Sequence, residues 1–134
     1  MQRIVQRKLP NGETKSVQPF HISMKGLKKA ILCRDNEDYG VMVKYIAVCA
    51  HRKNVIVIIY GVVSNHCHVA VLAASYLDAC DFADELKRNY AQWFLTKYLE
   101  KQILKDVDVQ ALVLDSDWYV RNALAYIPHN ALDN

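Results

Sequence analysis

Two histidines, His66 and His68, lie two positions apart in the segment SNHCHVAV, which runs from Ser64 to Val71. In an extended strand alternate side chains project from the same face, so the two imidazoles would stand side by side while Cys67 points to the opposite face. Two imidazoles supply half of a site for a divalent metal ion, and the other ligands must come from elsewhere in the chain. Those further ligands decide which chemistry the sequence predicts.

A tyrosine and an amide near the end of the chain are candidates for completing the site. Tyr126 and Asn130 are spaced i and i+4, which in a helix places both on one face about a turn apart. If this face covers the start of the histidine strand, Asn130 would complete a His, His, Asn metal site and Tyr126 would bring a phenol oxygen beside it. Tyr119 is the competing nucleophile on the same predicted helix, and Tyr126 is preferred because only it has an amide four residues later.

Hydrophobic periodicity and capping residues predict the elements that carry these side chains. A polar lead-in, residues 1–18, is expected to be flexible or to form a hairpin. In chain order the sequence then predicts a strand from Phe20 to Gly26, a helix from Glu37 to Arg52 capped by Asp35 or Asn36, a buried strand from Val55 to Val63, the histidine strand, a long helix from Ser75 to about Glu100, a strand from Gln110 to Asp117, and a helix from Trp118 to about Asn130.

This order of elements predicts an α+β fold in one domain over residues 1–134. A mostly antiparallel sheet with packed helices, of the ferredoxin-like or RRM-like type, fits the pattern. Ser64 and Asn65 provide turn chemistry between two β-rich runs, so the histidines are expected to begin a strand near a sheet edge. Asn65 either holds the first histidine by a hydrogen bond or only serves the turn.

Composition restricts the class of protein. The longest apolar run, from Val55 to Val63, is about half of the ~20 residues that a membrane helix needs, and the basic N-terminal segment is not followed by an apolar one. We therefore expect a cytoplasmic protein without a membrane partner. The four cysteines lack CxxC spacing, which argues against a zinc ribbon or a disulfide framework and favours buried thiols.

Basic residues gather at the end of the first predicted strand and after it. Lys25, Lys28, Lys29 and Arg34 are expected to cluster in one loop, in a chain whose formal net charge is +3. Such a cluster would suit the phosphates of a single strand or a hairpin. Solvated loop charges without a partner are the alternative interpretation.

Four segments resemble, in order and at similar separations, the HUH single-tyrosine transposases: FHISMKG, YGVVSNHCHVAVL, LKRNYAQWFLTKY and DWYVRNALAYIPHN. The resemblance covers Phe20 to Asn130 and is strongest to the transposases of the smallest insertion sequences and to the REP-associated tyrosine transposases. In that family two histidines and a late amide bind a divalent metal, and a tyrosine attacks a DNA phosphate. The resemblance thus implies metal roles for His66, His68 and Asn130 and a nucleophilic role for Tyr126.

The resemblance also implies the substrate and the reaction. The substrate would be single-stranded DNA with hairpin ends, cut and rejoined through a 5′-phosphotyrosine intermediate with Mg²⁺ or Mn²⁺ as cofactor. A tyrosine with an ordinary pKa of ~10 is a poor nucleophile at neutral pH, and a bound cation improves it or polarises the phosphate. Both a monomer and a homodimer are compatible with the sequence.

Two rival functions stay open at this point. The segment from Leu104 to Val109 reads LKDVDV where family members often have a tryptophan and an arginine, which favours a non-cutting, domesticated nucleic-acid-binding module of the same fold. A zinc hydrolase using the two histidines and water, with Tyr126 as a bystander, is the second. The histidine motif contains no acidic residue that would serve as its general base.

Overall fold

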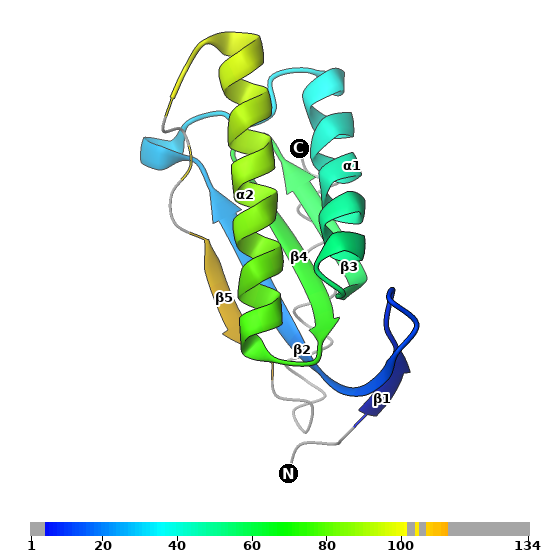
Figure 1. Cartoon of the computed structure of the whole chain (residues 1–134). Helices are drawn as coiled ribbons and strands as arrows, with labels where there is room; N and C mark the ends of the chain where they lie inside the picture. Colours follow the sequence, from blue (N-terminus) through cyan, green and yellow to red (C-terminus); the bar gives the residue numbers. More distant parts are fainter. Residues whose placement is uncertain (1–4, 102–103, 105–106, 113–134) are drawn as a thin grey trace.

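An antiparallel sheet carries two long helices on one of its faces (Figure 1). The computed structural model describes residues 5–101, 104 and 107–112. Its elements are the strands β1 (Val5–Lys8), β2 (Thr14–Lys25), β3 (Ile56–Val63), β4 (His66–Ala73) and β5 (Asp108–Ala111), the helices α1 (Asn36–Arg52) and α2 (Tyr76–Tyr98), and the short 3-10 helix η1 (Leu27–Lys29).

The sheet is built around β2 and β4. These two strands pair along eight residues, from Gln18↔Ala73 to Lys25↔His66, and β3 pairs with the other side of β4. β1 and β5 both pair with β2, and every pairing is antiparallel. The predicted α+β class, with a mostly antiparallel sheet and helices packed on it, is therefore confirmed.

The histidine strand has a different place in the sheet from the one predicted. His66 does begin β4, but β4 has a neighbour on each side, so the prediction of a position near a sheet edge is wrong. The reason is that β2, more than 40 positions earlier in the chain, supplies the second neighbour, as Ser23↔His68 shows. Local sequence patterns reveal the β3–β4 hairpin but not this long-range pairing.

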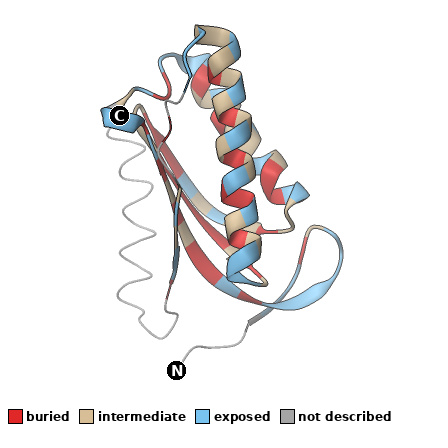
Figure 2. Cartoon of the chain, turned by 60° about the vertical axis from the view of Figure 1, so that its left-hand side comes forward, coloured by how far each residue is buried: buried red, intermediate tan, exposed pale blue. Residues whose placement is uncertain are grey.

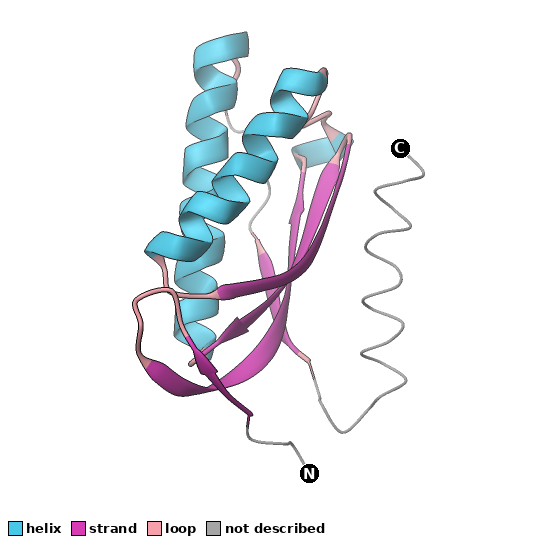
Figure 3. Cartoon of the chain, turned by 90° about the vertical axis from the view of Figure 1, so that its right-hand side faces the viewer, coloured by secondary structure: helices cyan, strands magenta, loops and turns pink. Residues whose placement is uncertain are grey.

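The first strand is longer than predicted. β2 begins at Thr14 instead of Phe20, because its exposed first part pairs with β1 in a hairpin around Gly12. Figure 3 shows this hairpin at one end of the sheet. The backbone N–H of Asn11 donates to Asn54 Oδ1 at 3.0 Å, which ties the hairpin to the connection between α1 and β3.

Both helices begin where their capping residues predict. The Asp35 side chain accepts from the backbone N–H of Asp38 at 2.9 Å, and Ser75 Oγ accepts from that of Asp78 at 3.1 Å. Each bond satisfies a backbone donor that the first helical turn would leave unpaired. α2 ends at Tyr98, where the next residue, Leu99, adopts a left-handed conformation with φ of 59°.

The core lies between the helices and one face of the sheet, as the buried residues in Figure 2 show. Alternate residues of the two central strands point towards the helices, and apolar residues of both helices meet them. These core residues include Phe20, Ile22, Met24, Cys67, Val69 and Val71 from the sheet and Met42, Ile46, Phe82, Leu86, Tyr90 and Phe94 from the helices. Cys33, Cys49 and Cys67 are buried free thiols, and Cys80 is partly exposed.

The C-terminal part of the chain departs from the prediction at its start. β5 begins at Asp108, two residues before the predicted Gln110, and pairs with residues 20–23 of β2. The predicted final helix and its residues Tyr119, Tyr126 and Asn130 lie outside the described residues. Within the part of the chain that the structure describes, neither helix is long and apolar enough to cross a membrane.

Candidate functional site

The candidate site lies on the face of the sheet opposite α1 and α2, called here the histidine face. The register pairs His68 with Ser23 and His66 with Lys25, so these four side chains share that face. His21 belongs to the same face because it is two residues before Ser23 on β2. Helix-facing residues such as Cys67 alternate with them, so one pair of strands supplies both the core and the site.

The structure brings His66 and His68 together. Their ring centroids are 4.9 Å apart and their planes are nearly perpendicular, at 82°. On β3 the residue paired with His68 is Gly61, which has no side chain to compete for space beside the ring. The two imidazoles therefore form one compact donor pair at the start of β4.

Each imidazole uses its Nδ1 for a hydrogen bond within the protein. His66 Nδ1 lies 2.7 Å from Asn65 Oδ1, and this amide oxygen accepts the proton of Nδ1. His68 Nδ1 lies 3.1 Å from His21 Nε2 and 3.3 Å from Ser23 Oγ. Asn65 also serves the connection with its backbone, since its carbonyl accepts from the N–H of Gly26 at 3.1 Å. The two interpretations of Asn65 are thus compatible.

Burial and nearby positive charge keep the histidines neutral. Burial, with smaller contributions from His21, His66 and Lys25, lowers the pKa of His68 from 6.5 to about 4. Burial, followed by the charge of Lys25, also lowers the pKa of His66. A neutral imidazole retains the lone pair with which histidine binds metals. At neutral pH the site therefore presents two imidazoles in the ligating form.

His21 is a member of the site that the sequence analysis missed. Burial lowers the pKa of His21 too, and its ring lies nearly parallel to that of His68, at 7° and 5.1 Å between centroids. The alternation in FHISM does place His21 and Ser23 on one face of a strand. The missing information was that β2 is the neighbour of the histidine strand.

Three of the four basic candidates lie in the connection between β2 and α1, as predicted, and only Lys25 differs because it is the last residue of β2. Lys25 is the last residue of β2 and pairs with His66, while Lys28 and Lys29 belong to η1, which lies just beyond it. Arg34 instead binds Glu100, with its Nη2 3.1 and 2.9 Å from the two carboxylate oxygens. Lys25 also falls inside the strand predicted from Phe20 to Gly26, and β2 does extend to this residue.

Arg34 also packs against aromatic rings of α2. Its guanidinium carbon lies 5.0 Å from the ring centre of Phe94 and 4.4 Å from that of Tyr98. Cation–π contacts of this kind hold a guanidinium against the protein. Among the four basic candidates, Arg34 therefore has contacts that suit a structural role.

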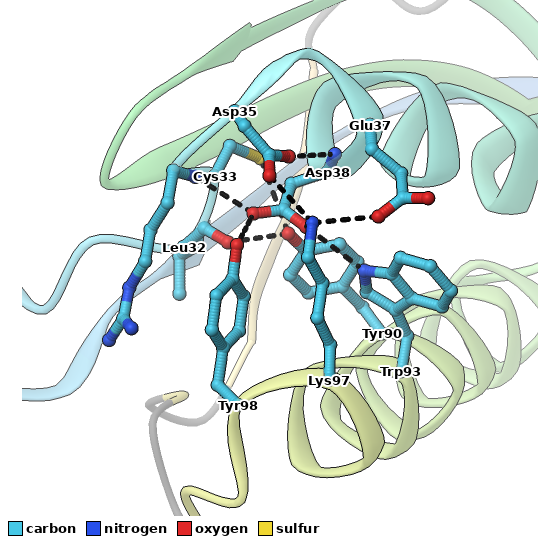
Figure 4. A network of polar contacts seen from close by, with 10 residues as sticks. Leu32, Cys33, Asp35, Glu37, Asp38, Tyr90, Trp93, Lys97 and Tyr98 are labelled. Carbon is cyan, nitrogen blue, oxygen red and sulfur yellow. Dashed lines mark hydrogen bonds and ion pairs between the residues drawn. The ribbon is translucent and has the colours of Figure 1, made fainter.

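A second group of ligand-type residues lies away from the histidine face, at the start of α1. The carboxylates of Asp35, Glu37 and Asp38 come close together, but Lys97 Nζ lies among them, at 2.7, 2.8 and 3.0 Å respectively (Figure 4). Burial alone would lower the pKa of Lys97, yet its hydrogen bonds to these carboxylates raise it. The ammonium group takes the position that a cation would need, so we interpret this group as a structural link between α1 and α2.

Asp38 is the centre of this link. Its side chain is fully buried and accepts from the backbone N–H of Arg34 at 2.9 Å, from Trp93 Nε1 at 3.2 Å and from the Tyr98 hydroxyl. Burial raises the pKa of Asp38, but these bonds and that of Lys97 more than offset it, so the pKa lies below its ordinary value. The carboxylate is therefore charged and fully paired in the folded protein.

Comparison with solved structures finds proteins that share this fold. A REP-associated tyrosine transposase bound to a REP hairpin aligns over 99% of this chain and 72% of its own, with a TM-score of 0.64 and 12% sequence identity. A transposase candidate from Deinococcus radiodurans R1 aligns over 85% of this chain and 91% of its own, with a TM-score of 0.61 and 13% identity. No protein-family model and no curated protein matched the sequence. The chain thus has the fold of these two proteins, in agreement with the resemblance to HUH single-tyrosine transposases.

Proposed function

We propose that the protein is a metal-dependent transposase that cleaves and rejoins single-stranded DNA by tyrosine attack. The observation that carries this proposal is the pair His66 and His68, two neutral imidazoles on one sheet face with Nδ1 of each engaged in a hydrogen bond. The fold shared with the two transposase structures supports it. Titratable side chains whose pKa values are shifted by burial and by neighbouring charge are concentrated at functional sites, which also supports the proposal.

The residues of the histidine face fit a divalent metal. With Nδ1 engaged, His66 and His68 would bind it through Nε2, and Asn130 would supply the third protein ligand. A donor set of two nitrogens and one amide oxygen accepts Mn²⁺ well and Mg²⁺ less tightly. When bound, such an ion polarises a phosphate oxygen and neutralises charge that develops during phosphoryl transfer.

Tyr126 would act as the nucleophile. Its phenolate oxygen attacks the phosphorus of one phosphodiester, a bond from tyrosine oxygen to phosphorus forms, and the bond to the 3′ oxygen breaks. The 3′ oxygen leaves as a free 3′-OH, taking up a proton in place of the one that the tyrosine hydroxyl lost, and the 5′ end stays attached as a phosphotyrosine. Attack by another 3′-OH reverses the step and joins strands without ATP, because one phosphoester replaces another.

The DNA would approach along the end of β2. One of the structural neighbours is described as bound to a REP hairpin, and we propose a single strand with hairpin ends as the substrate here. Lys25 lies beside His66 in the register, and Lys28 and Lys29 follow in η1. The Lys25 and Lys28 side chains would contact phosphates next to the cut, which would fix the position of the strand without reading its sequence. Arg34 stays a weaker candidate for a DNA contact because it binds Glu100.

A homodimer stays a prediction, and β3 is the strand at which a second copy would add. Among the described strands β3 pairs with β4 alone, and its Ile58 and Tyr60 are 43% and 42% exposed. An edge strand with apolar exposed side chains and no lysine or proline favours pairing with another strand. Light scattering over a range of protein concentrations distinguishes monomer from dimer.

A covalent protein–DNA adduct tests the proposed function. The protein is incubated with labelled single-stranded hairpin DNA from the flanks of its own gene and with Mn²⁺ or Mg²⁺, and the products are separated on a denaturing gel. We expect a slow band that disappears with Tyr126→Phe and with His68→Ala. If the band survives Tyr126→Phe and is lost with Tyr119→Phe, the nucleophile is Tyr119.

The same assay separates the rival functions. Binding of the hairpin DNA without an adduct, in the presence of either metal, would favour the non-cutting module, which the departure of the segment from Leu104 to Val109 motivates. Stoichiometric zinc that survives dialysis, together with hydrolysis that does not need Tyr126, would favour the zinc hydrolase.

A further inference from the structure

We infer that His21 is a positioning residue that accepts the Nδ1 proton of His68 and so directs the Nε2 of His68 towards the metal. The hydrogen-bond geometry motivates this: His21 Nε2 is 3.1 Å from His68 Nδ1, closer than Ser23 Oγ at 3.3 Å. The metal part of the inference rests on the proposed function. The tautomer of His68 is a property of the metal-free protein and can be measured without it.

Both atoms that contact His68 Nδ1 can act as hydrogen-bond acceptors, so this nitrogen can carry the proton. A neutral imidazole carries one N–H donor and one acceptor nitrogen, and a hydroxyl oxygen can accept as well as donate. His21 Nε2 and Ser23 Oγ can therefore both accept from His68 Nδ1–H. With the proton on Nδ1, the Nε2 lone pair is the one that remains for coordination.

For the neighbouring histidine, His66, the hydrogen bond at Nδ1 allows only one tautomer. The partner of His66 Nδ1 is the Asn65 amide oxygen, which has no proton to give, so the proton must be on His66. An identical tautomer of His68 would make the two imidazoles equivalent donors. Asn65 and His21 then perform one task for the two members of the pair, from the turn before β4 and from the neighbouring strand β2.

The contact with His21 restricts the orientation of the His68 ring. With 7° between the planes of His21 and His68, an N–H in the plane of one ring can point at the acceptor of the other. His68 is only 8% exposed, so few other orientations are open to it. Loss of the His21 acceptor would leave Ser23 Oγ, whose hydroxyl can equally donate to Nδ1 and favour the wrong tautomer.

Nitrogen NMR of the metal-free protein tests the tautomer directly. Long-range ¹H–¹⁵N spectra distinguish a protonated from an unprotonated ring nitrogen, and we expect His68 to be protonated at Nδ1. His21→Phe keeps a flat ring without an acceptor and should move the population towards the Nε2–H form. His21→Gln has an oxygen that can accept, so it should retain the wild-type signal. A wild-type His68 protonated at Nε2 would overturn the inference.

Metal affinity gives the second readout. Titration with Mn²⁺ is expected to show affinity about 10–100-fold weaker for His21→Phe, with recovery towards wild type in His21→Gln, in line with the usual effect of losing a partner of a ligating histidine. Equal affinity in wild type and His21→Phe would overturn the positioning role. If Mn²⁺ does not bind the wild type, or no DNA adduct forms, the proposed function fails by itself and the NMR result still decides the inference about His21.

Discussion

The pKa of His68 is strongly lowered in the folded protein, mainly by burial and further by the nearby His21, His66 and Lys25. Its pKa of about 4 in the folded protein compares with an ordinary value of 6.5. Between these pH values the unfolded chain binds a proton at this position and the folded protein does not. The contribution of His68 to stability is therefore complete above about pH 6.5 and is lost as the pH falls towards 4.

We expect the free energy of unfolding of the metal-free protein to fall by on the order of 3 kcal/mol from His68 as the pH is lowered across this range. Urea unfolding at a series of pH values measures it. In His68→Gln the position no longer titrates, so the fall should be smaller, with a remainder from His21 and His66, whose pKa values are also lowered. A pH profile of the same steepness in both proteins would contradict this account.

At the same scale, the spacing of His66 and His68 was sufficient to predict a shared strand face, since the period of two is local to the chain. The role of Asn65 could be stated only as two alternatives, because a hydrogen bond and a turn require the same residue type. His21 could not be found, since its proximity to His68 depends on a pairing between residues 47 positions apart. Sequence periodicity contains no information on that pairing.

At the scale of elements, the α1–α2 link depends on Asp38. In Asp38→Asn, one of two oxygens that accept from Lys97, Trp93, Tyr98 and the backbone of Arg34 becomes an amide donor that faces other donors. We expect a loss of about 3–5 kcal/mol, the usual result of removing one partner of a buried ion pair. Thermal or urea unfolding measures it.

Glu37→Gln is the matched control for this link, since Glu37 binds the same Lys97 ammonium from an exposed position, with a side chain that is 61% accessible. Its loss should change the free energy of unfolding by less than about 1 kcal/mol. Equal losses in the two variants would show that burial of Asp38 does not decide the strength of the link.

Substitution by alanine is expected to have opposite effects on stability at two glycines, Gly26 and Gly40. A Cβ on Gly26 would lie 2.2 Å from the backbone oxygen of Ala30, whereas a Cβ on Gly40 would have nothing within 4 Å. Gly26→Ala should therefore destabilise the protein by about 1–3 kcal/mol and disturb the end of β2 beside Lys25. Gly40→Ala, inside α1, should stabilise it by about 0.5–1 kcal/mol. Unfolding curves that shift in the same direction for both would contradict the close approach at Gly26.

The elements themselves were predictable where their signals are local. Asp35 and Ser75 mark the starts of both helices because a cap and the first turn are adjacent in sequence. The first part of β2 was missed, since Thr14, Lys15 and Ser16 are exposed and Val17 is the first buried residue of the strand, which leaves too short an alternation to recognise. The fold divides the predicted basic cluster between the end of β2, η1 and the residues just before α1.

At the scale of the whole molecule, the order of elements and their lengths were enough to predict a mostly antiparallel sheet with packed helices, because few architectures bury such elements. The arrangement leaves the histidines, Ser23 and Lys25 of the two central strands on the other face. That face and the end of β2 are where the proposed DNA strand would lie, since Lys25 pairs there with His66. Charge at this position should affect binding, and charge on the helix side should not.

The salt dependence of DNA binding tests this placement of the strand. If Lys25 contacts a phosphate, Lys25→Gln removes one ion pair, and the slope of log affinity against log salt concentration should become shallower by about 0.7 for single-stranded DNA. Lys44→Gln, a change of the same charge at an exposed position on α1, should leave the slope unchanged. Fluorescence anisotropy with a labelled hairpin at several salt concentrations gives both slopes. Equal reductions in the two variants would mean that the DNA responds only to the net charge of the protein, and a reduction in Lys44→Gln alone would move the DNA to the helix side.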